Sequence, residues 1–280
     1  MENPEPQLRL EFGVLCVFYF TVIASIRMMD VTKVRWMKLE ERLAKDIRIN
    51  GMGQVPGGNY GKINTDGAAT IQGEVRCASF TANGSLKLTN SIYAEQFRLN
   101  GTGRGSGTIA GGQLRVDGTM KLDGDVSFSR ININGMLQAR GGAVGEQAHI
   151  DGGMKLDGSA QYETLKVHGL IQVGGRLRAR ELDIVMAGAC RASEIRGERI
   201  SVRKKLGVSR VLAWLSSSLA PRLTAELIEG DDIVLEATKA GVVRGNTIRI
   251  GPGCEIDRVE YRVHYEADPG ASVGRAGQAP

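Results

Sequence analysis

The chain has 280 residues, of which 42% are hydrophobic and 24% are charged, and this balance excludes a wholly disordered protein. A formal net charge of +5 at pH 7 and a pI near 9.1 favour contact with anionic surfaces. Nucleic-acid modules usually combine basic stripes with stacking aromatic side chains. Because only 5% of the residues are aromatic, we expect no nucleic-acid partner.

The cysteines and histidines predict neither a disulfide framework nor a metal site, because none of them shows ligand spacing. We expect no metal and no cofactor, and we expect the thiols to be cytosolic and mostly buried. The cysteines are Cys16, Cys77, Cys190 and Cys254. The histidines are His149, His168 and His264.

Residues 1–45 form an N-terminal tail in this interpretation. Its apolar stretch, residues 12–26, carries no charge but is shorter than the ~20 residues of a membrane-spanning helix. Two interpretations stay open: the stretch anchors the chain in a membrane, or translation begins at Met37 and residues 1–36 are not made. Residues 37–45 are too short for more than one or two helical turns and give no clear cap for the next domain; the alternative is that these turns cap it nonetheless.

Residues 46–202 contain a repeat of about 17 residues, which is typical of stacked repeat architectures. The signature is apolar-x-apolar followed by Asn or Asp and then Gly, as in Phe97–Gly101 and Ile131–Gly135. The signature glycines keep this interval along the whole segment, and only their first step is shorter, by a single residue. They are Gly51, Gly67, Gly84, Gly101, Gly118, Gly135, Gly152 and Gly169. Asn-Gly and Asp-Gly at these positions predict sharp corners in the backbone.

Each repeat holds three short segments of alternating apolar and polar residues, for example 114–116, 120–122 and 126–128. Alternation with period two predicts short strands with one buried face. We therefore predict an all-β fold, a right-handed parallel β-helix with a triangular section, three short strands per coil and roughly nine coils over 46–202. The predicted core column contains Phe97, Leu99, Leu114, Val116, Ile131 and Ile133.

Residues 203–222 interrupt the repeat with an insert that is both basic and apolar. Trp and aliphatic side chains can bury at a membrane interface while Arg and Lys contact anionic lipid. One interpretation is therefore a membrane-contacting loop, and the other is a short helix packed across the rod. The predicted membrane contacts are Val211, Leu212, Trp214, Leu215, Arg203, Lys204, Lys205 and Arg210.

Strand-like alternation resumes over residues 223–265, which either extend the first rod or fold back beside it. The corners of this second segment are predicted at Gly230, Gly245 and Gly251. Residues 266–280 are small and polar, and we expect a disordered tail there.

These features resemble the bactofilins, a family of bacterial polymer-forming cytoskeletal proteins, over about residues 46–265. The resemblance rests on the repeating coil with Asn-Gly or Asp-Gly corners and on the segments 47–67, 225–232, 243–246 and 250–254. It is strongest with the longer members from Gram-positive spore-forming bacteria. The resemblance implies a structural scaffold that assembles end to end, without nucleotide, at the cytoplasmic face of the membrane. The partners that it implies are further copies of the same chain, the anionic membrane surface, and envelope or cell-shape proteins.

Other β-helical functions stay open as alternatives. A carbohydrate-active lyase or hydrolase would need clustered carboxylates on one outer face. The Asp and Asn residues of the repeat do form a column, but each precedes a glycine, so a turn explains it and we expect no catalytic residue and no enzyme. A hexapeptide-repeat acyltransferase would need a steady six-residue period, and a carbohydrate-binding or adhesin module would be secreted.

Overall fold

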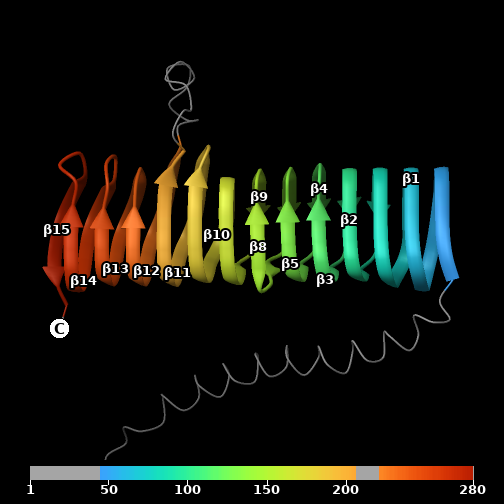
Figure 1. The fold of residues 1–280 in the computed structure, drawn as a ribbon, viewed down its shortest axis with the longest axis horizontal. Coiled ribbons are helices and arrows are strands. Elements are labelled where there is room, and N and C mark those ends of the chain that lie inside the picture. The colour runs from blue at the N-terminus through green and yellow to red at the C-terminus, as the bar shows by residue number, and fades with distance from the viewer. Residues whose placement is uncertain (1–44, 206–220, 280) are drawn as a thin grey trace, which may run out of the picture. The chain divides into compact units, whose positions relative to one another are not determined.

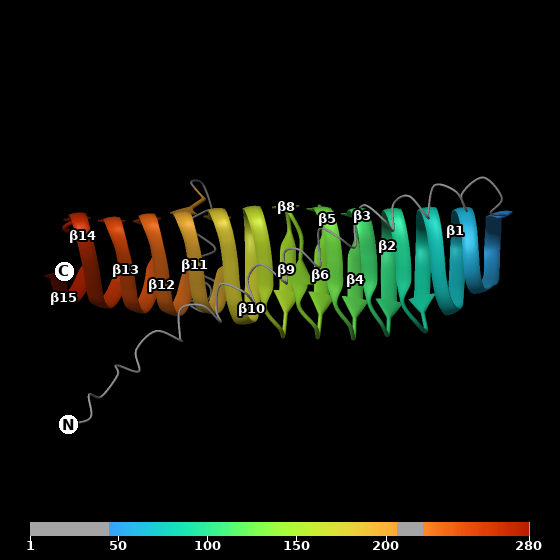
Figure 2. The same ribbon diagram turned by 90° about the horizontal axis from the view of Figure 1, so that it is seen from below.

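The structure, a computed structural model, describes residues 45–205 and 221–279. Their regular secondary structure is entirely β, and each pair of neighbouring strands is parallel. Figures 1 and 2 show the coils of this unit stacked along one axis in chain order. The strands are β1 (Lys45–Leu88), β2 (Ile92–Gly105), β3 (Ile109–Val116), β4 (Thr119–Leu122), β5 (Val126–Ile133), β6 (Met136–Ala139), β7 (Ala143–Val144), β8 (Gln147–Ile150), β9 (Gly153–Leu156), β10 (Ala160–Met186), β11 (Ala189–Lys204), β12 (Arg222–Leu235), β13 (Thr238–Ile250), β14 (Glu255–Ala267) and β15 (Ser272–Gln278).

The predicted parallel β-helix is confirmed. Ile92 pairs with Ile109 and Ile109 with Val126, so each residue lies beside its counterpart in the next repeat. Every coil has three sides, which we name by their inward pairs in one coil: side A has residues 114 and 116, side B 120 and 122, and side C 126 and 128. The predicted core column is buried on side A, with each side chain exposed by 1% or less. Its members are Phe97, Leu99, Leu114, Val116, Ile131 and Ile133.

The corner glycines are required for two different physical reasons. Gly51, Gly67, Gly84 and Gly101 have φ between +94° and +139°, a conformation that side chains with a Cβ rarely adopt. From Gly118 to Gly169 the signature glycines no longer have this conformation. At Gly118 a Cβ atom would overlap the carbonyl oxygen of Gly101 in the preceding coil, and the same overlap with the preceding corner glycine exists at Gly67, Gly84 and Gly101. The later glycines thus permit close backbone approach between coils.

The Asn and Asp residues before these glycines form a hydrogen-bonded ladder along the rod. The Asn83 amide donates to Asp66 (2.7 Å), and the Asn100 amide donates to Asn83 (2.7 Å). Further along, Asn134 donates to Asp117 at 2.6 Å. The column of Asn and Asp residues before the glycines therefore links successive coils at one corner.

The coil length changes in the C-terminal half of the β-helix. The step from Leu182 to its partner Ile200 is one residue longer than the regular repeat, and the step from Ile233 to its partner Ile248 is two residues shorter. The strands remain parallel, and local register shifts such as the one between Val173 and Arg176 absorb the change in coil length. The core therefore continues with Ile195, Ile228 and Val243 on side C, each fully buried.

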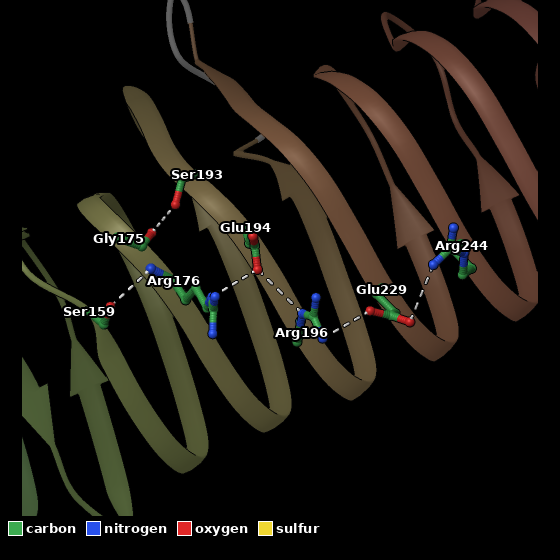
Figure 3. A network of polar contacts seen from close by, with 8 residues as sticks. All are labelled: Ser159, Gly175, Arg176, Ser193, Glu194, Arg196, Glu229 and Arg244. Carbon is green, nitrogen blue, oxygen red and sulfur yellow. Dashed lines mark hydrogen bonds and ion pairs between the residues drawn. The ribbon is translucent and has the colours of Figure 1, made fainter. Parts of the chain in front are cut away.

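A ladder of alternating charges crosses this irregular region (Figure 3). Glu194 lies between Arg176 (3.0 Å) and Arg196 (3.5 Å), and Arg196 also reaches Glu229 at 3.4 Å. Arg244 continues the ladder, 3.9 Å from Glu229. The Arg244 side chain also donates a hydrogen bond to Glu260, which lowers the pKa of that carboxyl below its usual value. These contacts join five coils where the glycine repeat is absent.

The second repeat segment extends the first rod, which decides between the two alternatives. β12 pairs in parallel with β11, placing Leu223 beside Cys190 and Ile233 beside Ile200. The interruption is shorter than the predicted 203–222, because β11 runs to Lys204 and β12 begins at Arg222. The interior of the insert, residues 206–220, lies outside the described residues.

The expectation of a disordered tail over 266–280 is wrong for the residues described. β14 continues to Ala267, and β15 pairs with it so that Val273 lies beside Ile256. The Ser272 amide donates to the Cys254 carbonyl at 2.8 Å, and the Ala279 amide donates to the Tyr261 carbonyl at 2.8 Å. The edge of β14 offers backbone donors and acceptors to the residues that follow it. Pairing with this edge orders β15, although its small residues show little hydrophobic pattern.

The close approach at the corners gives a testable prediction. We expect Gly118→Ala to lower the free energy of unfolding by about 1–3 kcal/mol, because the new methyl group overpacks the corner against Gly101. Urea unfolding followed by circular dichroism measures the change as a lower midpoint.

Gly188 provides the matched control for this substitution. Its φ is not in the left-handed region, and a Cβ there would lie no closer than 3.6 Å to Leu170. We expect Gly188→Ala to leave the midpoint unchanged or raise it slightly, because alanine restricts the unfolded chain. Equal midpoints for the two alanine variants would contradict the role of close approach.

Candidate functional site: the ends and one face of the β-helix

The N-terminal coil leaves apolar side chains partly uncovered. Ile47 and Ile49 on β1 are half-buried, whereas Ile63 and Thr65, one coil later, are at most 1% exposed. The sequence places all four at inward positions of the repeat. Within residues 45–205 and 221–279, no further coil packs on the outer edge of this first coil.

The C-terminal coils have the same property. Tyr265 and Ala267 pair with Ile248 and Ile250 and continue the inward column of side A. Ile248 and Ile250 are at most 2% exposed, but Tyr265 is only half-buried and Ala267 is exposed. Tyr265 stacks on Tyr261 with ring centroids 5.4 Å apart, and partial burial raises its pKa. In the described chain β15 pairs only with β14, so this end also presents unpaired strand edges.

One outer position of side B is basic over most of the rod, and we call it the basic column. Strand pairing aligns this position from Lys87 to Lys239, with Gln138, Gln172 and Thr224 between the cations. The column consists of the exposed residues Lys87, Arg104, Lys121, Lys155, Arg191 and Lys239.

The basic column is electrostatically unfavourable for the isolated rod. Lys87, Arg104 and Lys121 lie in three successive coils, about 4.8 Å apart, and like charges directly opposite each other destabilise a sheet. Of the six cations only Lys239 forms an ion pair with another described residue, 3.9 Å from Glu255. Glu255 also accepts a hydrogen bond from the Arg222 guanidinium, which lowers the pKa of the Glu255 carboxyl. The column therefore carries positive charge in one line on the outside of the rod, and five of its six cations have no ion pair with another described residue.

The predicted membrane-contact residues fall into two groups. Val211, Leu212, Trp214, Leu215 and Arg210 lie outside the described residues. Arg203, Lys204 and Lys205 follow the last inward residue of β11 and are exposed. The Arg203 guanidinium is 2.8 Å from Asp183, so its charge is partly neutralised, while Lys204 and Lys205 have no ion pair with a described residue. The chain re-enters the rod at Pro221 and continues into side B.

The described cysteines are buried, as expected. Burial raises the pKa of Cys77 to about 12 and also raises the pKa values of Cys190 and Cys254, so these thiols stay protonated at neutral pH. No helix in residues 45–205 and 221–279 is long and apolar enough to cross a membrane.

One polar cluster of the rod is not evident from the sequence. His149, Asp151 and His168 come together on the outside of the rod, with ligand-type atoms all within 4.8 Å of one another. Asp151 and His168 are one coil of 17 residues apart, and His149 lies two residues before Asp151, so the two histidines do not show the three- or four-residue spacing of a local metal site. The expectation that the histidines lack the arrangement of metal ligands is therefore wrong for two of the three.

Two proteins of Bacillus subtilis (strain 168) are similar to this chain. The uncharacterized protein YhbE is 52% identical over 226 residues, which cover 80% of this chain and 94% of YhbE. The uncharacterized protein YhbF is 40% identical over 80 residues, which cover 29% of this chain and 31% of YhbF. No family model matches the sequence, and no solved structure gives a significant match. With half of the matched residues identical over almost the full length of YhbE, the chain belongs to the same protein family as YhbE.

Proposed function

We propose that the chain is a structural subunit of the bactofilin type, which assembles end to end into filaments on the cytoplasmic face of the membrane. The observation that carries the proposal is the state of the two ends. Inward apolar positions that are sealed inside the rod become accessible at Ile47 and Ile49 and again at Tyr265 and Ala267.

Stacking a second subunit on such an end would repeat the contact that already holds the coils together. Parallel coils present backbone donors and acceptors along their edges, and an uncovered edge is a template for another strand. The added contact would bury the partly exposed apolar side chains, a change that is favourable in water. No nucleotide is needed for this kind of contact.

The membrane part of the proposal is supported by charge. The basic column on side B places six cations in one line along the rod, and Lys204 and Lys205 add two more where the chain enters the insert. Each cation near an anionic leaflet is worth about 1 kcal/mol, so a filament would accumulate attraction along its length.

Assembly should be independent of nucleotides. The sequence has no Gly-rich phosphate loop followed by Lys and Ser or Thr. We expect purified protein to form sedimentable filaments above a threshold concentration, with the same threshold whether ATP, GTP or neither is present. Electron microscopy of the pellet identifies the filaments; dispersed monomers at all concentrations, or a strict need for nucleotide, would contradict the proposal.

A charge on the C-terminal end should block assembly. In a filament of either polarity each rod uses both ends, so we expect Ala267→Glu to raise the threshold concentration strongly or abolish sedimentation. Ala267 is exposed, so the unassembled variant should keep the β circular dichroism spectrum of the wild type.

The matched control is His264→Glu, which introduces the same side chain three residues away on β14. His264 is exposed and precedes the inward Tyr265, so its side chain lies on the outer surface of side A. We expect this variant to sediment like the wild type. Equal behaviour of the two glutamate variants would refute the use of the end face.

Membrane binding should depend on the insert and on the basic column. We test it with a chain that begins at Met37, so that residues 12–26 cannot contribute. Flotation of this chain with vesicles containing anionic lipid should weaken in the Trp214→Ser, Leu215→Ser double variant. It should also weaken in the Lys121→Glu, Lys155→Glu double variant and at high salt, where surface attraction is screened.

The charge-matched control for the basic column is the double variant Lys62→Glu, Lys166→Glu. Both lysines are exposed, and strand pairing places Lys166 on side A beside His149. We expect flotation to fall less than for Lys121→Glu, Lys155→Glu. An equal loss for both pairs would indicate that only net charge matters, and unchanged flotation of all variants would remove the membrane role.

A further inference from the structure

The His149, Asp151 and His168 cluster is built by two successive coils. His149 is an outward residue of β8, Asp151 follows β8 at the corner, and His168 lies one coil further on β10. His149 Nε2 is 3.0 Å from Asp151 Oδ2, and His168 Nδ1 is 3.1 Å from Asp151 Oδ1. The two imidazole rings meet edge to face with centroids 5.3 Å apart. One carboxylate is thus held between two imidazole nitrogens.

The same arrangement with different chemistry occurs two coils earlier. Asp117 accepts a hydrogen bond from Arg115, two residues before it (2.6 Å), and from Asn134, one coil after it (2.6 Å). Asp151 has the same two neighbours by position, but both are histidine. The guanidinium of Arg115 and the amide nitrogen of Asn134 can only donate, whereas a neutral imidazole offers a lone pair to a metal ion.

We propose that His149, Asp151 and His168 bind a zinc-class divalent transition-metal ion. Two imidazole nitrogens and one carboxylate oxygen are ligands that Zn²⁺ accepts, with a fourth position open to solvent. In tetrahedral geometry these bonds of about 2.0–2.2 Å separate ligand atoms by about 3.3 Å. The 3.0 and 3.1 Å separations run to the two different oxygens of Asp151, and one ligand atom from each residue lies within 4.8 Å of the others. Side-chain rotations that bring both imidazole nitrogens to about 3.3 Å from one carboxylate oxygen, and from each other, complete the site.

The surroundings determine what the fourth ligand is. Lys166 pairs with His149 across the coils, and Arg130 lines the same surface pocket as His149 and Lys166. Their positive charges oppose a bare dication and favour an anionic fourth ligand such as hydroxide or chloride. The bound ion would join two coils at one corner, and this site goes beyond the proposed scaffold function.

The test uses the full chain without a polyhistidine tag, loaded with Zn²⁺ and dialysed against metal-free buffer. We expect the wild type to retain one additional Zn²⁺ per chain compared with the His149→Arg, His168→Asn double variant. That variant copies the Arg115, Asp117 and Asn134 arrangement, so both hydrogen bonds to Asp151 and the fold are kept. Zn²⁺ should raise the melting temperature of the wild type more than that of the variant, because the ion binds only the folded site.

The reciprocal variant tests whether the arrangement itself makes the site. Arg115→His with Asn134→His should add a second Zn²⁺ per chain, and Co²⁺ in its place should give the visible absorption of four-coordinate nitrogen and oxygen ligation. Equal Zn²⁺ content in the wild type and the His149→Arg, His168→Asn variant would overturn the proposal. So would the absence of any gain in the reciprocal variant, since both rest on two imidazoles flanking one corner carboxylate.

Discussion

Each coil of this protein is held in place by the coils on either side of it. A single coil has no interior of its own, because its three short strands bury their apolar side chains only when neighbouring coils cover them above and below. Parallel backbone pairing fixes that contact in register, so Phe97, Leu114 and Ile131 form one column and the Asn and Asp side chains form another. The corner glycines, the polar ladder and the outer charge columns all follow from this stacking, because it places each residue beside its counterpart in the next coil.

The same dependence explains how much of the fold was predictable. Period-two alternation inside a longer constant period has few other structural solutions, so the coil, its corners and its core could be derived from residues such as Leu114 and Val116. The tail could not, because Ala271 and Val273 are too few to mark a strand. The tail is ordered because β15 pairs with the edge of β14, and the sequence of the tail itself does not indicate this pairing. The sequence likewise does not show that β12 continues the rod, because this depends on its pairing with β11 across the insert.

The candidate sites were less predictable because they are made by alignment between coils. Lys87, Arg104 and Lys121 do not stand out in the sequence, and their line along side B emerges only when repeats are placed beside each other. His149 and His168 were missed for the same reason. The sequence predicts that the rod has uncovered ends, as any solenoid does. Identifying Tyr265 and Ala267 as residues of such an end requires knowing where strand pairing stops.

The way the chain leaves and re-enters the rod separates positions where residues can be inserted or deleted from positions where they cannot. The Lys205 amide still donates to Met186, and Arg222 takes its place beside Ala189, so the coils on either side of the insert are in register. The length of the segment between these points can therefore change without displacing any coil. A deletion of one residue inside a strand has the opposite effect, since it turns inward side chains outward up to the next corner. Gains and losses of residues among relatives should accordingly collect at this junction and at the corners, and be rare within the strands.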